Sequence, residues 1–381
     1  MIQLPSRFDD IRPYYDSEIP AAMERIASDP LLEKILSFLG KEGRLGQVQQ
    51  MLRSISTTDQ FQHGVMARIL GSIVERTTDS FTYEGVRENA SAATGRLFVS
   101  NHRDIVMDAY LQQFAQMENG IPTSHITFGS NLMNPQFVVD IGCSNKMFRT
   151  VRKVPEAKAF LEASIHLSDY INYVTAHGES LWIAQRNGRT KDGFDKTEPG
   201  LLRMLLLDGD KLQALKSLHI TPVAISYQWE PCDELKAVEL YRSKGGPYVK
   251  AKGEDLNSIV TGITQRKGGV HLAICPEVEA SRFSGLLSRD DMESVVKEMD
   301  DKIYGGYKIW DTNLVASDIL SGSGRFEGVY SPALKDEFME RLSKMLENHK
   351  DMDRDTLRRI YLGIYAGPVS NSPVYGKELN K

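Results

Sequence analysis

The chain has 381 residues, of which 41% are hydrophobic and 25% are charged, and its formal net charge is −5. This length allows a large core, the composition is that of a soluble globular protein, and the negative charge argues against a general nucleic-acid-binding protein. Three widely spaced cysteines outside CxxC pairs predict neither a disulfide framework nor a zinc site, but buried thiols in a reducing compartment. They are Cys143, Cys232 and Cys275.

The first twenty residues are acidic and lack an apolar centre, so they do not form a signal peptide. We find no run of about 18 apolar residues, so the sequence predicts no transmembrane helix. We therefore expect a cytoplasmic protein. Peripheral contact with the inner face of a membrane is an alternative that the sequence does not decide.

Residues 1–80 predict a helical N-terminal segment. Apolar side chains recur at helical spacing over residues 19–40, where Pro30 interrupts the run, and again over residues 61–77. Such amphipathic helices are typical of packing against a core, and a role at a lipid surface is the alternative.

Residues 81–282 predict an α/β domain, because short β-rich runs alternate with helical runs. The β-rich runs are 96–101, 125–130, 147–154, 180–186, 220–229 and 268–275, and the helical runs are 105–117, 135–142, 156–176 and 234–246. We expect a mixed central sheet flanked by helices. Residues 283–381 predict a C-terminal helical segment that packs on the same domain, with helical runs at 292–305 and 335–349.

The segment RLFVSNHRDIVMDAYLQQF contains the first candidate catalytic residues. An apolar strand ends at Val99, His102 follows in a polar stretch, and a helical pattern then begins. A histidine at the carboxyl end of a strand lies where α/β folds build their sites, and a nearby aspartate can orient its ring. Asp104 and Asp108 are both near. The alternative is a structural loop histidine, with Asp104 as a helix N-cap.

Two further segments carry cations at predicted strand ends. The first, SNKMFRTVRKVPEAK, carries Arg149, Arg152 and Lys153, and the second, LWIAQRNGRTKDGFDK, carries Arg186, Arg189 and Lys191 around Gly188. Several cations around a glycine in a loop suit a phosphate, which arginine binds bidentately. Each cluster could instead be a solvated basic surface, but three such segments in order favour a shared site.

Other catalytic classes lack their motifs. The chain has no G-x-S-x-G elbow of serine hydrolases and no G-x-x-x-x-G-K-[ST] phosphate loop. The HRD at 102–104 is that of a kinase catalytic loop, but Ala109 stands where a kinase has Asn and the glycine-rich SGSGRFEG lies downstream. The remaining histidines show no metal-ligand spacing, so we expect no metal site.

Four blocks over about residues 95–232 resemble, in order, the glycerolipid acyltransferase superfamily, whose members acylate glycerol-3-phosphate or lysophosphatidic acid. They are SNHRDIVMD, FGSNLMNPQFVVDIGCSNKMFRTVRK, IAQRNGRTKDG and ITPVAISYQWEPC. Two features depart from the family pattern. The family places four residues between His and Asp, but Met107 holds that position here, with Asp104 earlier and Asp108 one later. We favour Asp108, because it follows the apolar residues. The glutamate of the third block is missing, and Asn187 or Arg186 takes its place.

The resemblance implies a glycerol-3-phosphate acyltransferase-like fold and no metal or redox cofactor. It implies transfer of a fatty acyl group from acyl-CoA or acyl carrier protein to glycerol-3-phosphate or lysophosphatidic acid in phospholipid synthesis, with His102 as general base. The phosphate-binding candidates it implies are Arg152, Arg189 and Lys191, then Arg149, Lys153 and Arg186, with Asn187 and Gly188 at the acceptor hydroxyl. The alternatives are another lipid or sugar alcohol as acceptor, or a catalytically idle lipid- or acyl-carrier-binding protein.

Overall fold

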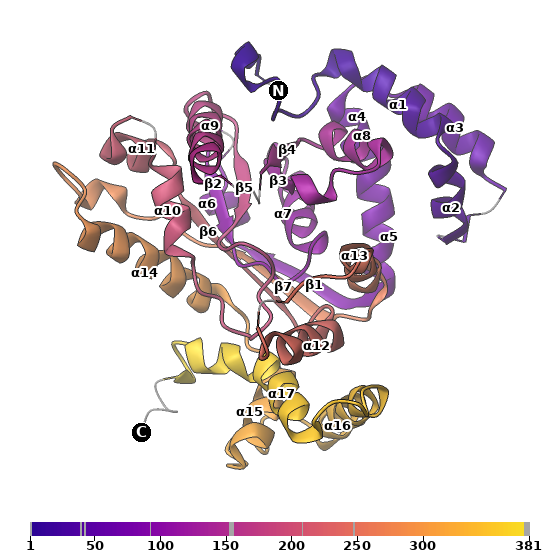
Figure 1. Cartoon of the computed structure of the whole chain (residues 1–381), viewed down its shortest axis with the longest axis vertical. Helices are drawn as coiled ribbons and strands as arrows, with labels where there is room; N and C mark the ends of the chain where they lie inside the picture. Colours follow the sequence, from indigo (N-terminus) through magenta and orange to yellow (C-terminus); the bar gives the residue numbers. More distant parts are fainter. Residues whose placement is uncertain are drawn as a thin grey trace.

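The centre of the molecule is a seven-stranded sheet with strand order β1-β7-β6-β2-β5-β3-β4 (Figure 1). The computed structural model describes residues 2–38, 40–41, 43–91, 93–151, 156–207, 209–246 and 248–376. The strands are β1 Thr78–Glu84, β2 Leu97–Ser100, β3 His125–Gly129, β4 Met147–Thr150, β5 Leu181–Ala184, β6 Thr221–Tyr227 and β7 Gly268–Ile274.

The sheet is mixed, which confirms the predicted fold class. Strands β6, β2, β5, β3 and β4 run parallel, whereas β7 pairs antiparallel with β6, and β1 pairs parallel with β7. Six strands coincide with runs expected from the sequence. Strand β1 does not, because it is an edge strand with no buried residue and its TDSFTYE lacks a clear apolar pattern. The predicted boundary at residue 80 falls inside β1.

Helices cover both faces of the sheet because alternate strand residues point to opposite sides. Leu97 and Val99 of β2 pack under α9 (Ala157–Ala176), α10 (Pro199–Leu205) and α14 (Arg289–Gly306). Phe98, the residue between them, packs on the other face under α5 (Ala67–Thr77) and α7 (Met107–Glu118). Figure 1 shows these two layers on either side of the strands.

The shorter elements connect these layers. They are the helices α6 Val86–Asn89, α11 Lys211–Ser217 and α13 Glu254–Thr264, the 3-10 turns Ser6–Phe8, Asp16–Glu18, Ser130–Leu132 and Ala280–Arg282, and the π-helical turn Gln62–Met66. Several helices begin at side-chain caps visible in the sequence. Ser288 forms a capping box with Asp291 at the start of α14, and Asp210 caps α11.

The N-terminal helices lie at the periphery of the molecule, where they pack on one another and on α8 (Figure 1). Helices α1 (Ile19–Ser28), α2 (Pro30–Phe38), α3 (Leu45–Arg53) and α4 (Thr58–Phe61) share an apolar cluster with Phe137 of α8 (Gln136–Ser144). Buried Asp140 of α8 adds a polar link, because it accepts hydrogen bonds from Arg25 Nε at 2.9 Å and Nη2 at 2.7 Å. None of the helices within the described residues has the length and apolar character needed to cross a bilayer.

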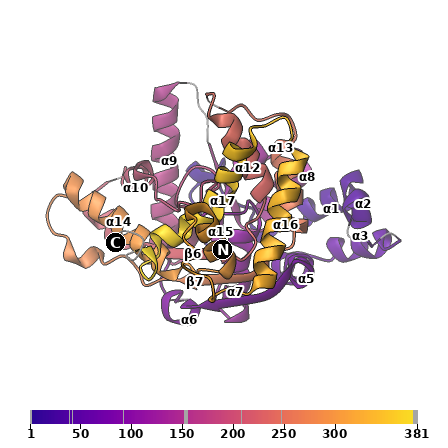
Figure 2. The same cartoon turned by 90° about the horizontal axis from the view of Figure 1, so that it is seen from below.

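The C-terminal helices α15 (Asp311–Ser321), α16 (Pro332–Asn348) and α17 (Arg354–Asn371) pack with α12 (Asp233–Ser243) around a second apolar cluster. Seen from below, they lie in front of β6 and β7 (Figure 2). Asp233 joins them to α12. It accepts from Arg341 at 2.9 and 3.1 Å, from the Tyr361 hydroxyl at 2.6 Å and from the Tyr365 hydroxyl at 2.7 Å.

Replacing Asp233 with asparagine is expected to lower the free energy of unfolding at neutral pH by about 3 kcal/mol, because it leaves the Arg341 charge without a partner. Burial raises the pKa of Asp233, but Arg341 and the two tyrosines outweigh it and leave this pKa lowered. A lowered pKa stabilises the fold above the unfolded-state value and loses that effect as pH falls through the folded-state value. In urea unfolding, the difference in free energy of unfolding between wild type and Asp233→Asn should therefore become smaller as the pH falls. A difference that grows would contradict this.

Candidate functional site

The candidate site lies where the parallel strands end. Strand β2 is central in the sheet, and His102 follows its last residue, Ser100, by two positions. The neighbouring strand β5 ends at Ala184, so its outgoing loop starts at the same edge. In parallel sheets this carboxyl edge is where connecting loops bring functional side chains together.

His102 is bonded to Asp108, not to Asp104. Its Nδ1 lies 2.9 Å from Asp108 Oδ2, and both side chains are buried. Because the carboxylate accepts, Nδ1 carries the proton, which leaves the Nε2 lone pair to act as an acceptor. Within the described residues Nε2 makes no hydrogen bond. This arrangement suits a general base that takes a proton from a bound hydroxyl.

Asp108 is held by four donors. Besides His102, its carboxylate accepts from the backbone N–H of Arg103 at 2.6 Å, the N–H of Asp104 at 2.9 Å and the Tyr227 hydroxyl at 2.7 Å. Burial, and then the Asp108 charge, raise the pKa of Tyr227, so this hydroxyl stays protonated and donates. The carboxylate is therefore satisfied and fixed in orientation before any substrate binds.

Asp104 bonds the start of a helix. Its Oδ1 accepts from the N–H groups of Val106 at 2.9 Å and Met107 at 2.8 Å, just where α7 starts. The capped turn over residues 104–106 accommodates the extra residue between His102 and Asp108. The residue at the N-cap of α7 is Val106 rather than Asp104, although Asp104 bonds the first N–H groups there, and Asp104 does not contact the histidine.

The residue after His102 belongs to a buried ionic network. Arg103 is fully buried and donates to Asp195 at 2.5 Å and to Glu230 at 3.1 Å. Lys236 donates to Glu230 and to the Arg103 carbonyl at 2.5 and 2.7 Å, so two cations meet two carboxylates. Burial lowers the pKa of Arg103, but Asp195 and then Glu230 outweigh it and leave this pKa well above its ordinary value. Ionic pairing of this kind offsets the cost of burying charge.

Arg189 is the predicted cation that is buried in the loop next to the histidine segment. The next residue, Thr190, donates its N–H to the His102 carbonyl at 2.6 Å. Arg189 is 7% exposed, and its Nη1 is buried without a hydrogen-bond partner among the described residues. It also interacts with Cys232, where it opposes the rise in thiol pKa caused by burial. A buried guanidinium with an unused N–H group is suited to an anionic ligand.

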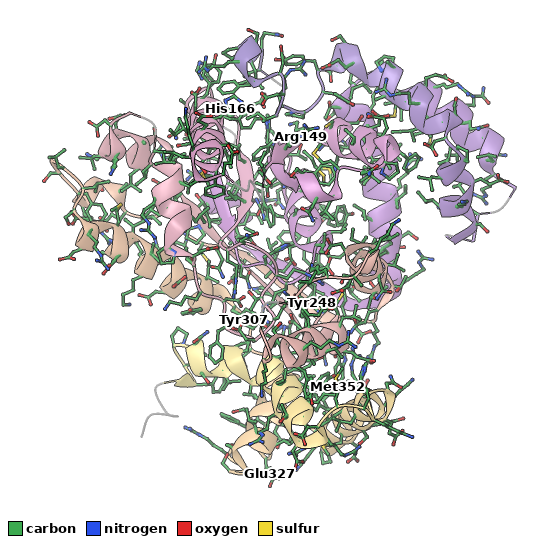
Figure 3. All side chains as sticks on the ribbon, viewed as in Figure 1. Arg149, His166, Tyr248, Tyr307, Glu327 and Met352 are labelled. Atoms are coloured by element: carbon green, nitrogen blue, oxygen red, sulfur yellow. The ribbon has the colours of Figure 1, made fainter. Side chains whose placement is uncertain are left out.

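The other predicted cations differ from Arg189. Lys191 is bonded to Glu239 of α12, and Arg186 is half-buried, 3.9 Å from Asp192. Arg149 is exposed near the end of β4, which β5 and β3 separate from β2. Figure 3 shows it far from Tyr307, whose ring contacts Arg103 beside the histidine. Arg152 and Lys153 lie outside the described residues.

The residues predicted for the acceptor hydroxyl lie in the loop before Arg189. Asn187 is exposed, and its N–H donates to Glu198 at 3.0 Å. Gly188 has a φ of +80°, in the left-handed region that glycine adopts without strain, and this turns the chain toward Arg189. The carboxylate beside position 187 is therefore that of Glu198, which bonds the backbone of Asn187.

Three contributors to the site were not found from the sequence. Tyr227 and Asp195 hold the site residues as described, and the Trp182 ring packs edge-on against His102 with centroids 5.9 Å apart. Tyr227 ends β6 at the same edge of the sheet, so its position at the end of an expected strand could have identified it as a site residue. Asp195 follows the third block by a few residues and nothing in its local pattern distinguishes it.

A cavity of about 420 Å³ lies beside the site, between α12, α13 and α16, with Cys232, Thr261 and Arg341 among its lining residues. His102 does not line it. All three cysteines are free and buried, as expected. In the described part of the chain, no group of three or more His, Cys, Asp or Glu residues is arranged to hold a metal ion.

No family model matches the chain, and no curated protein matches its sequence. Among solved structures, it is similar to the 1-acyl-sn-glycerophosphate (LPA) acyltransferase PlsC from Thermotoga maritima. That similarity has 14% sequence identity and a TM-score of 0.38, and it covers 74% of this chain and 90% of the other. Similarity this low assigns no activity, so the chemistry has to come from the geometry of the residues.

Proposed function

We propose that the protein is an O-acyltransferase that moves a fatty acyl group from acyl-CoA or acyl carrier protein to the hydroxyl of glycerol-3-phosphate or lysophosphatidic acid. The observation that carries the proposal is the buried His102–Asp108 pair with the unused Nη1 of Arg189 in the adjoining loop. A general base next to an anion-binding arginine suits an acceptor that carries both a hydroxyl and a phosphate. Proton removal and phosphate binding then occur within one site.

The reaction follows from the free Nε2 of His102. Nε2 takes the proton of the acceptor hydroxyl as the oxygen attacks the thioester carbonyl. The resulting tetrahedral intermediate loses the thiolate as the carbon–sulfur bond breaks, and the imidazolium returns its proton to the thiolate. Asp108 stabilises the imidazolium through its 2.9 Å contact with Nδ1, and Tyr227 stabilises the carboxylate. No covalent enzyme intermediate and no metal or redox cofactor is required.

Arg189 fixes the acceptor through its phosphate, with Arg186 and the Asn187–Gly188 turn at the outer side of the same loop. For these substrates we expect a cytoplasmic protein that works at the inner face of a membrane. Arg149 lies too far along the sheet edge to share the phosphate with Arg189 in this arrangement.

Replacing Arg189 with methionine is expected to raise the KM for the phosphate-bearing acceptor by at least about tenfold, the scale of one charge-assisted contact. The KM for the acyl donor should change little, because the donor does not depend on this contact. Initial rates with each substrate varied in turn test this. The matched control is Arg203→Met on α10, which removes an exposed arginine from outside the site. An unchanged acceptor KM in Arg189→Met would contradict the assignment.

Because the third block lacks the family glutamate, a different acceptor substrate is the second candidate. Asn187 is exposed and offers an amide where the family has a carboxylate, which suits another lipid or sugar alcohol. A screen of acceptors with one acyl-CoA distinguishes the two. A catalytically idle acyl-carrier-binding protein would release no free CoA from acyl-CoA with any acceptor in that screen.

A further inference from the structure

One buried carboxylate contacts both the histidine segment and the basic loop. Asp195 is 2% exposed, and its Oδ2 accepts from Arg103 Nη2 at 2.5 Å, Arg103 Nε at 3.2 Å and Asn101 Nδ2 at 3.1 Å. Its Oδ1 accepts from the Thr190 hydroxyl at 2.7 Å. A single side chain therefore bonds three residues that belong to two loops.

Each of these three residues is tied to His102. Asn101 and Arg103 are its neighbours in the chain, and Thr190 donates its N–H to the His102 carbonyl at 2.6 Å. Asn101 is also fixed to β6, because its side chain bonds the carbonyl of Ile225 at 2.9 Å and the N–H of Ile225 at 2.7 Å. Asp195 thus connects two parts of the site. Through Asn101 and Arg103 it holds the histidine segment, and through the Thr190 hydroxyl it holds the basic loop beside that segment.

We propose that Asp195 is a positioning residue that sets the separation between the base His102 and the anion-binding Arg189. This rests on the proposed acyl transfer. Arg189 directly precedes Thr190, so the Asp195–Thr190 bond, together with the bond from the Thr190 N–H to the His102 carbonyl, fixes the backbone from which the Arg189 side chain extends. An acceptor held at its phosphate must present its hydroxyl within about 3 Å of Nε2, and an error near 1 Å can cost up to about 100-fold in rate. Asp195 would supply this alignment without touching the substrate.

The decisive test is a double-mutant cycle between Thr190→Val and Arg189→Met, measured as kcat/KM with glycerol-3-phosphate and one acyl-CoA. Thr190→Val keeps the side-chain shape, the Thr190 N–H and the Arg103–Asp195 ion pair, and removes only the hydroxyl that bonds Asp195. We expect it to lower kcat/KM about tenfold in the wild-type background and less than about twofold in Arg189→Met, because a missing phosphate contact leaves nothing to align.

Thr190→Ser, which keeps the hydroxyl, is the matched control and should retain most of the wild-type activity. Asp195→Asn should show the same non-additivity with a larger loss, and urea unfolding reports whether each variant is folded. A Thr190→Val effect of equal size in both backgrounds would overturn the positioning role, because a loss of stability or of base activity does not depend on Arg189. If the wild-type protein transfers no acyl group to any acceptor, the proposed function fails, and the alignment role fails with it.

Discussion

Replacing His102 with alanine is expected to lower the rate of acyl transfer by roughly 100- to 10,000-fold, the range that a positioned general base contributes. The variant removes the Nε2 lone pair that would take the acceptor proton, and Asp108 cannot replace it, because its carboxylate still accepts from the N–H groups of Arg103 and Asp104 and from the Tyr227 hydroxyl. Release of free CoA, followed with a thiol reagent in the presence of acceptor, measures the loss.

The matched control for this variant is His177→Ala, because His177 is an exposed histidine at the end of α9 that bonds only the backbone of its own helix. It should keep the wild-type rate. Circular dichroism and urea unfolding establish that both variants are folded. A folded His102→Ala protein with the wild-type rate would remove the histidine from the mechanism, and the proposed function would lose its central observation.

Asp108→Asn is expected to reduce kcat by roughly 100-fold or more, with little change in the KM of either substrate. The amide carries no negative charge to stabilise the imidazolium, and its nitrogen takes the Oδ1 position beside the Tyr227 hydroxyl, because two backbone N–H groups hold its oxygen at the Oδ2 position. The side chain keeps its size, and one oxygen remains to accept from the backbone N–H groups of Arg103 and Asp104. The loss should therefore be in the chemical step.

Asp104→Asn separates the two aspartates that the sequence left as alternatives. Asparagine also caps helices, so the bonds to Val106 and Met107 can persist. We expect less than a tenfold loss of kcat, far below that of Asp108→Asn. Equal losses in the two variants would mean that Asp104 reaches the histidine during catalysis, contrary to the geometry of the free protein.

Asp104 and Asp108 have different roles because they lie four residues, about one helical turn, apart in the chain. Asp104 lies three residues before α7 and bonds the N–H groups at its start, whereas Asp108 lies in the first turn of α7, where its side chain reaches back to the histidine. The capped turn between them absorbs one residue relative to the family spacing. A departure in sequence spacing is thus compatible with an ordinary His–Asp contact.

The Arg103 network adds rigidity to the same segment. Its four charges are buried and paired, so removal of one partner would leave an uncompensated charge in the core. The residues on both sides of His102 are therefore held by backbone groups of β6, by Asp195 from the loop after β5 and by Lys236 from α12. This agrees with a site whose donors are in place before the substrate arrives.

Local patterns in the sequence were enough to predict most of the fold. Six strands, the main helices of the α/β region and the position of His102 at a strand end follow from apolar periodicity and polar strand ends, which depend only on neighbouring residues. The order of the basic segments after His102 is also a property of the chain alone. The expectation that the cysteines are buried came from composition and spacing.

Only the tertiary structure decided which of these residues meet. Strand β1 forms because Thr78–Glu84 pairs with β7, almost 200 residues later, and its own side chains carry too little apolar pattern to predict it. The sheet order places β5 beside β2 and β4 at the far edge, which brings Thr190, the residue after Arg189, into contact with His102 and keeps Arg149 away. The choice of Asp108, and the contacts of Asp195 and Tyr227, likewise depend on how loops distant in sequence pack at one edge of the sheet. Periodicity within one segment cannot encode such contacts.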